Sequence, residues 1–384
     1  MRIEALKIKN FKVFKDVTVS NLPSLCVFVG VNGSGKTTLF DVFSFLKDAL
    51  RDNVTVAVNR RGGFRELISR GCDPEKDSIE IEIRFRLSNP EPVSSLTYFV
   101  AFGLINDAIT VKKEQVFVHF YGKETAENHL NYSEGVGFFL DNPQKLDLKY
   151  KDILAVKALS FFKESIFLQA ISSYLSTVYI STFQAETLRI SANNSDTKSL
   201  SNTGDNLARV ARYTYVYRQS VFEKILTKLT KLIPGIDAVE ARETEDGRIV
   251  LRFNDKNFQD PFSATFISDG TMKLFAYLLL LNESESPNLL CLEEPEQDFY
   301  PNLLPYLVEE IREHTEQWDC QIFVSTHSPE FVDAVQLNEL FYMVKQDGFS
   351  IIRAAADDPV VSELAKDNSL GWLWRNNYLQ ANSL

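Results

Sequence analysis

The chain has 384 residues, 45% hydrophobic and 24% charged, which is typical of a globular protein with a sizeable core and argues against disorder. Its formal net charge of −11, from 41 Lys and Arg against 52 Asp and Glu, excludes a broadly basic surface for nucleic acid or membranes but still allows a local basic patch. The N-terminus lacks the apolar core of a signal peptide, and the longest apolar run, 274–281, is far too short to span a bilayer. We therefore expect a cytoplasmic protein without membrane contact.

The first predicted elements are strands at 2–10 and 24–29, and the second leads into a glycine-rich loop. Residues 24–38 read SLCVFVGVNGSGKTT and match G-x-x-x-x-G-K-[ST] from Gly30 to Thr37. Glycines let successive backbone N–H groups point into one concavity, where a helix N-terminus receives phosphates. The helix is predicted from apolar residues at helical spacing: Leu39, Phe40, Val42, Phe43, Leu46 and Leu50.

This loop predicts a nucleotide site in which different residues bind the phosphates and the metal ion. Lys36 is expected to reach the outer phosphates of the nucleotide, and Thr37 is expected to hold Mg²⁺. The alternative, a strand-to-helix turn without a ligand, is disfavoured because the strand and the helix both stand where the motif requires them. The predicted nucleotide-binding residues of the loop are Asn32, Gly33, Ser34, Gly35, Lys36, Thr37 and Thr38.

The middle of the chain predicts a mixture of strands and helices. The basic stretch 60–70 is interpreted as a solvated face, with a phosphate or nucleic-acid contact as the alternative. Residues 78–120 alternate apolar and polar side chains in several runs, which predicts antiparallel strands. The elements expected after them are a helix over 151–176, a strand over 178–182, a mobile polar loop over 191–206, a long helix over 205–233, and two short strands joined by the turn 245–247.

The stretch FISDGTMKLFAYLLLL, 266–281, predicts a strongly apolar helix that begins just after Ser268. The Ser268 hydroxyl, the free N–H groups near Gly270 and the helix dipole would all point one way, as in an anion site without a lysine. Taken alone, SDGT is more typical of an ordinary helix cap.

The stretch LLCLEEPEQDFYP, 289–301, predicts a buried strand that ends in two adjacent carboxylates. We expect Glu293 to belong to the Mg²⁺ shell and Glu294 to orient or deprotonate the attacking water. The alternative is a pair of solvated acids at the end of a strand.

The stretch QIFVSTHSPEFVD, 321–333, predicts a strand that delivers His327 to its carboxyl end, where open parallel sheets keep their ligands. His327 is expected to bond the γ-phosphate or the water. The remaining potential ligands are interpreted as structural, the cysteines as reduced core thiols without C-x-x-C spacing: His119, His129, His314, Cys26, Cys72, Cys291 and Cys320.

In this order the four motifs resemble the SMC, RecF and OLD branch of ABC-type ATPases, the heads that are not attached to transporters. The matching stretches are IEALKIKNFKVF, GVNGSGKTTLFD, SDGTMKLFAY, LEEPEQDFYP and STHSPEFVD. They cover a minor part of the chain but bracket most of it. The resemblance implies that two heads close head to tail on ATP, so that Ser268 and Gly270 of one copy meet the γ-phosphate held by Lys36 of the other.

The chain departs from the family pattern at several positions. The signature reads ISDGT where transporters have LSGGQ, and Glu293 stands where aspartate is commoner. Tyr300 replaces a frequent histidine. The glutamine that senses Mg²⁺ in the family is assigned to Gln184, after the strand VYIST, and the long coiled coils of SMC proteins are missing because no sustained heptads occur.

The predicted fold class is therefore α/β, a P-loop NTPase of the ABC-type ATPase head with an antiparallel β subdomain and an inserted helical lobe. We expect residues 1–150 to form the N-terminal part of the head, 151–260 the largely helical lobe, and 261–384 the C-terminal part with a short tail. The predicted activity is Mg²⁺-dependent ATP hydrolysis by a homodimer or higher homo-oligomer. The alternatives are a nucleotide-gated scaffold with little turnover, a transporter's nucleotide-binding subunit, and, as a poorer fit, a small-molecule kinase.

The sequence also predicts a partner, because it contains motor motifs but no second catalytic constellation. We expect a separately encoded effector, with a nuclease in anti-phage defence or DNA maintenance as the leading interpretation, and a DNA contact has only weak support. Trp372 and Trp374 near the C-terminus are interpreted as packing onto the ATPase core, with docking of the partner as the alternative.

Overall fold

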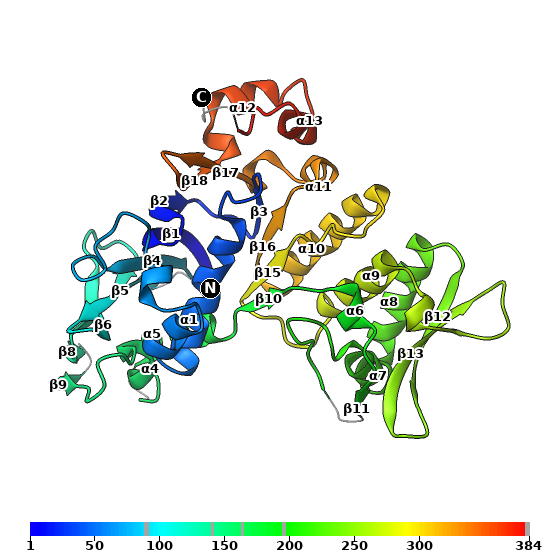
Figure 1. Ribbon diagram of the computed structural model, residues 1–384, viewed down its shortest axis with the longest axis horizontal. Coiled ribbons are helices and arrows are strands. Elements are labelled where there is room, and N and C mark those ends of the chain that lie inside the picture. The colour runs from blue at the N-terminus through cyan, green and yellow to red at the C-terminus, as the bar shows by residue number, and fades with distance from the viewer. Residues whose placement is uncertain (88–91, 140–141, 163–164, 194–196, 381–384) are drawn as a thin grey trace.

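The computed structural model describes residues 1–87, 92–139, 142–162, 165–193 and 197–380. Within these residues two large sheets lie on either side of a central helix, and a separate lobe of helices and a small sheet extends from one flank (Figure 1).

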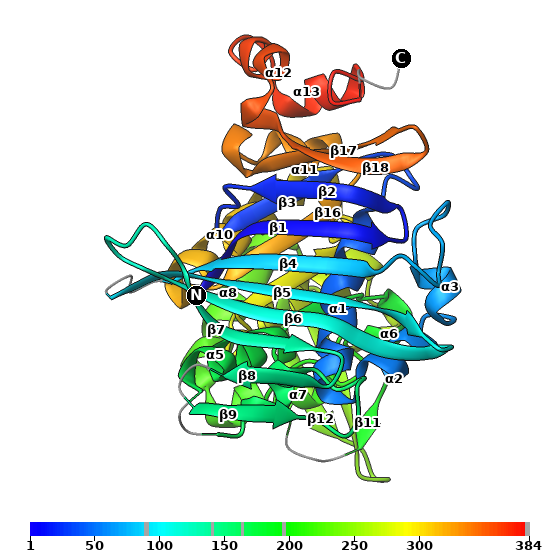
Figure 2. The same cartoon turned by 90° about the vertical axis from the view of Figure 1, so that its left-hand side faces the viewer.

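The first sheet is antiparallel throughout, in the order β2-β1-β4-β5-β6-β7-β8-β9, and Figure 2 shows it face on. Its alternating sequence buries one face, as in β4, where isoleucine and phenylalanine point inward and charged residues outward. The antiparallel prediction for 78–120 is confirmed, but the sheet is wider than expected. Its strands are β1 (Arg2–Phe11), β2 (Phe14–Ser20), β4 (Ile79–Arg86), β5 (Val93–Ile105), β6 (Ala108–Phe120), β7 (Glu127–Ser133), β8 (Val136–Phe139) and β9 (Asn142–Asp147).

The second sheet is mostly parallel and has the order β10-β15-β16-β3-β17-β18, with only β18 antiparallel. Continuous apolar runs fit strands covered on both faces, and every residue of β3 and β16 is buried. The carboxyl ends of the parallel strands therefore share one edge. The strands are β10 (Tyr179–Ser181), β15 (Leu289–Glu293), β16 (Gln321–Thr326), β3 (Leu25–Val29), β17 (Leu340–Gln346) and β18 (Phe349–Ala354).

Helix α1 (Lys36–Arg51) lies between the two sheets and joins their cores (Figure 1). Phe43 packs edge-on against Phe323 of the parallel sheet, with ring centroids 5.7 Å apart, and Phe45 stacks on Phe102 of the antiparallel sheet at 4.8 Å. Short helices surround it: α2 (Val54–Asn59), α3 (Phe64–Leu67), α4 (Ala155–Leu159) and α5 (Ile166–Ser176).

The single helix predicted over 151–176 is divided into α4 and α5. Ser165 explains part of the break, since its hydroxyl donates to the carbonyl oxygens of Leu159 at 2.5 Å and Phe162 at 2.7 Å. A serine that bonds nearby carbonyls competes with the helical backbone.

One face of the parallel sheet, α10 and the C-terminal helices share a second core with the lobe, in which α6 to α9 surround a third sheet. The long helix predicted over 205–233 is two helices, because Arg218 has non-helical angles (φ −139°, ψ 51°) and donates to the Asn282 carbonyl at 2.7 Å. The turn predicted at 245–247 is confirmed. The elements are α6 (Ala185–Leu188), α7 (Leu207–Tyr217), α8 (Gln219–Leu232), α9 (Asp269–Leu280), α10 (Leu304–Trp318), β11 (Ala192–Asn193), β12 (Ile236–Glu243), β13 (Arg248–Asp255) and β14 (Phe262–Ser263).

The polar stretch 191–206 is held at several points rather than free along its described length. Leu200 is buried, its N–H donates to Glu283 at 2.6 Å, and the Ser201 N–H donates to Asn206 at 2.9 Å. Residues 194–196 of the predicted mobile loop lie outside the described residues.

The C-terminal residues form α11 (Pro329–Asp333), α12 (Pro359–Leu364) and α13 (Leu370–Arg375), which gather beside β17 and β18 (Figure 1). All four cysteines are free thiols, and those other than Cys72 are buried. Among the described residues, no helix has both the length and the apolar character needed to cross a membrane.

Candidate functional site

The predicted motifs meet at the carboxyl edge of the parallel sheet. Strand β3 ends in the glycine loop, β15 ends at Glu293, and β16 delivers His327, while β10 leads to Gln184. This convergence follows from the parallel register, which pairs Val29 with Thr326 and Glu293 with Ser325.

The glycine loop has the backbone that its sequence predicts. Gly33 and Gly35 have φ of 78° and 106°, the left-handed region that glycine adopts without steric cost. Gly30 is also required by space, because a Cβ there would lie 2.8 Å from the Met343 carbonyl oxygen. The Ser34 hydroxyl is buried and has no hydrogen-bond partner among the described residues, which fits a group meant for a ligand.

Lys36 is buried inside this loop, only 6% exposed, and its ammonium donates to the Gly30 carbonyl at 2.8 Å. Burial lowers the pKa of Lys36, and the nearby carboxylates of Glu294, Glu296 and Glu293 oppose that shift. The Nζ atom also lies 2.8 Å from Nε2 of His327. A buried cation at the first turn of α1 fits the outer phosphates of a nucleotide.

The two adjacent acids face different partners. The Thr37 hydroxyl donates to Oε1 of Glu293 at 2.5 Å, so a hydroxyl and a carboxylate oxygen converge as a Mg²⁺ shell requires. Glu294 turns away with φ 44°, a conformation rare for a residue with a Cβ. Its Oε1 lies 2.9 Å from Nε2 of His327, and its Oε2 accepts a hydrogen bond from Gln297.

His327 is held through its backbone by Glu296, which the sequence analysis does not name, and by Trp374, which it assigns to packing onto the core. Oε1 of Glu296 accepts from the Thr326 hydroxyl at 2.7 Å and from the His327 N–H at 2.8 Å. Trp374 Nε1 donates to the His327 carbonyl at 3.0 Å. Glu296 stands within the EEPEQ stretch, which could have drawn attention to it, but no spacing rule indicates Trp374.

Ser268 and Gly270 stand at the start of α9, and among the described residues no hydrogen bond joins either of them to Lys36, Glu293 or His327. Helices α1 and α9 lie on opposite sides of the parallel sheet (Figure 1). Ser268 caps α9, with its hydroxyl accepting from the Thr271 N–H at 3.4 Å. A Cβ on Gly270 would lie 2.5 Å from the Asp298 carbonyl oxygen, so the helix end packs against the turn that follows the two acids. The cap expected from SDGT is present.

Gln184 caps the short helix α6 just after β10, and its side chain is exposed. Because β10 runs parallel to β15, with Ser181 opposite Leu292, Gln184 follows the same sheet edge as Glu293. Its role as a metal-sensing residue stays a prediction.

The basic stretch 60–70 is paired with acids along its length. Arg61 is nearly buried and bonds Asp41 at 2.7 Å and Asp48 at 3.0 Å, with its guanidinium over the Phe45 ring. The exposed arginines have partners as well: Arg60 with Asp48 and Asp52, Arg65 with Glu75, and Arg70 with Glu66. This pairing favours the solvated-face interpretation over a nucleic-acid contact.

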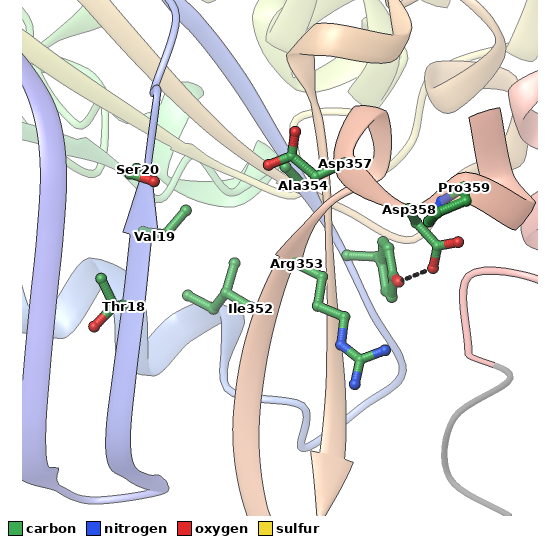
Figure 3. Close-up of a pocket in the computed structure, with 10 residues that line it drawn as sticks. Thr18, Val19, Ser20, Ile352, Arg353, Ala354, Asp357, Asp358 and Pro359 are labelled. Atoms are coloured by element: carbon green, nitrogen blue, oxygen red, sulfur yellow. Dashed lines mark hydrogen bonds between the residues drawn. The ribbon is translucent and has the colours of Figure 1, made fainter.

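A cavity of about 490 Å³ lies between β2 and β18, away from the motifs (Figure 3). It is lined by Thr18, Ser20, Arg353 and Asp357 among others, and Asp358 accepts a hydrogen bond from the Tyr342 hydroxyl at 2.6 Å. None of the predicted nucleotide ligands lines it.

Comparison with known proteins agrees with this geometry. A family described as "AAA domain" matches residues 5–232, more than half of the chain, and one described as "AAA domain, putative AbiEii toxin, Type IV TA system" matches 158–333. A search of the curated proteins gives no significant match.

Two solved SMC heads have a similar fold. One, an SMC head bound to the C-winged helix domain of ScpA, is 13% identical, with a TM-score of 0.55 over 92% of this chain and 98% of that one. The other, an SMC head with an extended coiled coil bound to the C-terminal domain of ScpA, derived from Pyrococcus furiosus, is 13% identical, with a TM-score of 0.53 over 95% of this chain and 100% of that one. The chain therefore belongs to the AAA-domain family, with a P-loop fold similar to that of SMC head domains.

Proposed function

We propose that this chain hydrolyses ATP with Mg²⁺ and that two copies close head to tail around the nucleotide. The observation that carries the proposal is two sets of contacts at one sheet edge, Lys36–His327–Glu294 and Thr37–Glu293. The first set supplies a cation and a general base, and the second supplies the oxygen ligands of a metal shell.

Each residue has a distinct part in the proposed reaction. Lys36 and the loop N–H groups bind the outer phosphates, and Thr37 and Glu293 would hold Mg²⁺, which when bound neutralises phosphate charge. Glu294 accepts the proton of the attacking water, and His327 bonds the γ-phosphate or that water. Because Glu294 already contacts His327, the base and the sensor of the γ-phosphate are aligned by one another.

The longer side chain of Glu293 suits this arrangement. It reaches the Thr37 hydroxyl directly, so the departure from the commoner aspartate leaves the hydroxyl and the carboxylate in contact. Gln184 would complete the metal site from the neighbouring strand, and its exposure leaves it free to move when nucleotide arrives.

The composite dimer would bring the second anion site to the first. Ser268 and Gly270 of one copy would meet the γ-phosphate held by Lys36 of the other. Exposed apolar side chains flank both halves, with Val31 45% and Phe266 79% exposed, as expected for surfaces that a partner covers.

A mixture of Ser268→Arg and Lys36→Ala subunits tests the proposal. Each variant alone should be inactive, whereas a mixed dimer contains one intact composite site and should recover part of the ATPase activity. Each variant at the same total concentration is the matched control. No recovery, despite mixing demonstrated by differently tagged subunits, would rule out the head-to-tail arrangement.

Hydrolysis in this chain would control a separately encoded effector, a nuclease in anti-phage defence or DNA maintenance. The similar SMC heads are both described as bound to a domain of ScpA, which supports partner docking on this fold. Trp372 is 39% exposed and stacks on Tyr378, so it remains available to a partner, whereas Trp374 is buried.

Co-purification of proteins encoded beside this gene tests the effector. A Glu294→Gln chain with ATP should change how much partner is retained, because binding of ATP and of partner are coupled reciprocally. Equal retention with and without nucleotide, for every neighbouring protein, would contradict regulation by closure.

A further inference from the structure

Arg189 joins the end of α6 to the segment 264–269, which leads into α9 and includes Ser268 of the proposed second anion site. It follows α6, the short helix that begins after Gln184. Its Nε donates to the Ala264 carbonyl at 3.1 Å, and its Nη2 donates to the Ile267 carbonyl at 2.6 Å and to a carboxylate oxygen of Asp269. One guanidinium therefore holds three points of the segment that leads into α9.

The ion pair between Arg189 and Asp269 matters because Asp269 places a negative charge at the start of α9. It stands between Ser268 and Gly270, in the position where the transporter signature has a glycine, and its side chain is 49% exposed. A carboxylate there favours the α9 dipole but repels a phosphate that approaches the same N-terminus. The site needs a neighbouring cation, and the Arg189 side chain, 18% exposed, supplies one.

The packing around Arg189 fixes it relative to the sheet edge. Leu188 is buried, and the ring centroid of Phe183 lies 5.0 Å from that of Tyr277 on α9. Strand β10, which precedes Phe183, pairs directly with β15, the strand that ends at Glu293. Covalent chain and packed side chains thus connect the metal-side acid to the α9 N-terminus.

We propose that Arg189 is a positioning residue of the second anion site, where it neutralises Asp269 and holds residues 264–269 so that Ser268 and Gly270 can meet a γ-phosphate. This inference rests on the proposed composite site. It accounts for the ISDGT departure, because a signature with a carboxylate is usable only when a cation is fixed beside it.

Four variants test the charge role: Arg189→Ala, Arg189→Lys, Asp269→Asn and the double variant Arg189→Ala with Asp269→Asn. Each is combined with Glu294→Gln, and ATP-dependent dimerisation is measured by light scattering, with binding of a fluorescent ATP analogue to dilute monomer as the second readout. The matched control is Arg212→Ala, which breaks the ion pair between Arg212 on α7 and Glu243 on β12.

Arg189→Ala should weaken dimerisation at least about tenfold, the loss expected for a charge-assisted hydrogen bond, and leave monomer affinity for the analogue within about twofold. Asp269→Asn in that background should restore most of the loss, because the repelling charge is gone. Arg189→Lys should fall between, since it keeps the charge without the fork that reaches the carbonyls. Arg212→Ala should match the parent.

A double variant as weak as Arg189→Ala would overturn the charge role and leave Arg189 as a loop brace. Should Arg189→Ala fail to fold, Asp269→Asn alone decides the matter: it should dimerise at least as well as the parent, and weaker dimerisation would contradict the proposal. Ser268→Arg separates the two hypotheses. Intact dimerisation of that variant would overturn the composite site itself, whereas its loss beside a normal Arg189→Ala would overturn only the inference about Arg189.

Discussion

The sheet-edge cluster around Lys36 and the segment around Ser268 are both predicted to bind phosphate, yet they are built differently. At the sheet edge, Lys36, Glu294 and His327 already contact one another within one chain. At the start of α9, the Ser268 hydroxyl bonds the backbone N–H and the hydroxyl of Thr271 in its own helix cap, and Arg189 is bound to Asp269. The first region is assembled by folding of one chain, whereas in the proposed composite site the second would bind phosphate only when another copy supplies Lys36.

The largest expected effect is a loss of ATP hydrolysis at the sheet-edge cluster with unchanged binding of ATP. Glu294→Gln should reduce ATP turnover by about 10²–10⁴-fold, because an amide cannot accept the water's proton. ATP affinity should be unchanged and ATP-bound dimers should accumulate, as measured by phosphate release and by light scattering. Turnover near the wild-type rate would show that another group is the base.

Removal of the cation should break binding in the first region. Lys36→Ala should weaken ATP binding about a hundredfold or more, since the loop keeps its N–H groups but loses the ammonium that is bonded to the Gly30 carbonyl. A calorimetric titration measures the change. Unaltered affinity would refute the phosphate-loop assignment.

Two buried carboxyl groups outside both regions make the stability of the fold depend on pH. Glu114 on β6 accepts hydrogen bonds from the N–H groups of Ala155 at 2.5 Å and Val156 at 3.0 Å at the start of α4, and burial raises its pKa to about 7. Glu283, just beyond the C-terminal end of α9, accepts a hydrogen bond from the Leu200 N–H at 2.6 Å, and burial raises its pKa to about 7 as well. Because folding raises the pKa of each carboxyl group, the protonated group contributes stability that is fully present below the ordinary pKa near 4.5. This contribution is lost as pH rises through about 7.

Glu114→Gln should therefore flatten the pH dependence of stability. The wild-type free energy of unfolding should fall by up to about 3 kcal/mol per group between pH 4.5 and 8. In the variant, the part of this fall that Glu114 causes should be absent. The variant should also be less stable at low pH, because its amide NH₂ meets an N–H donor. Thermal melts from pH 5 to pH 8 measure both effects, and an unchanged slope would contradict the assignment to Glu114.

The smallest expected effect concerns the link from the C-terminal helix to the sheet edge. Trp374→Phe keeps an aromatic ring but removes the Nε1–H that holds the His327 carbonyl, so turnover should fall several-fold and stability by about 1 kcal/mol. Trp372→Phe, which has no such bond to His327, is the control and should match wild type. Equal turnover in both variants would mean that the tail does not position His327.

The two tryptophans near the C-terminus differ in burial, which the sequence does not predict. Packing onto the core is confirmed for Trp374, which is 7% exposed, whereas Trp372 is largely at the surface. Two aromatic residues separated by one position on a short helix face different directions, and no pattern in the tail indicates which one is covered. Arg189 and Glu296 were missed for the same reason, since their partners are distant along the chain.

Local sequence patterns alone predict the strand, glycine loop and helix around Lys36, the strands that end at Glu293 and His327, and the cap at Ser268. These depend on short-range periods and on residue types that only one local geometry accommodates. Tertiary structure decided that Glu294 meets His327, that Trp374 holds the same loop, and that Arg189 faces Asp269. Such contacts depend on how parallel strands align at one edge and how the lobe packs on it, which no local pattern encodes.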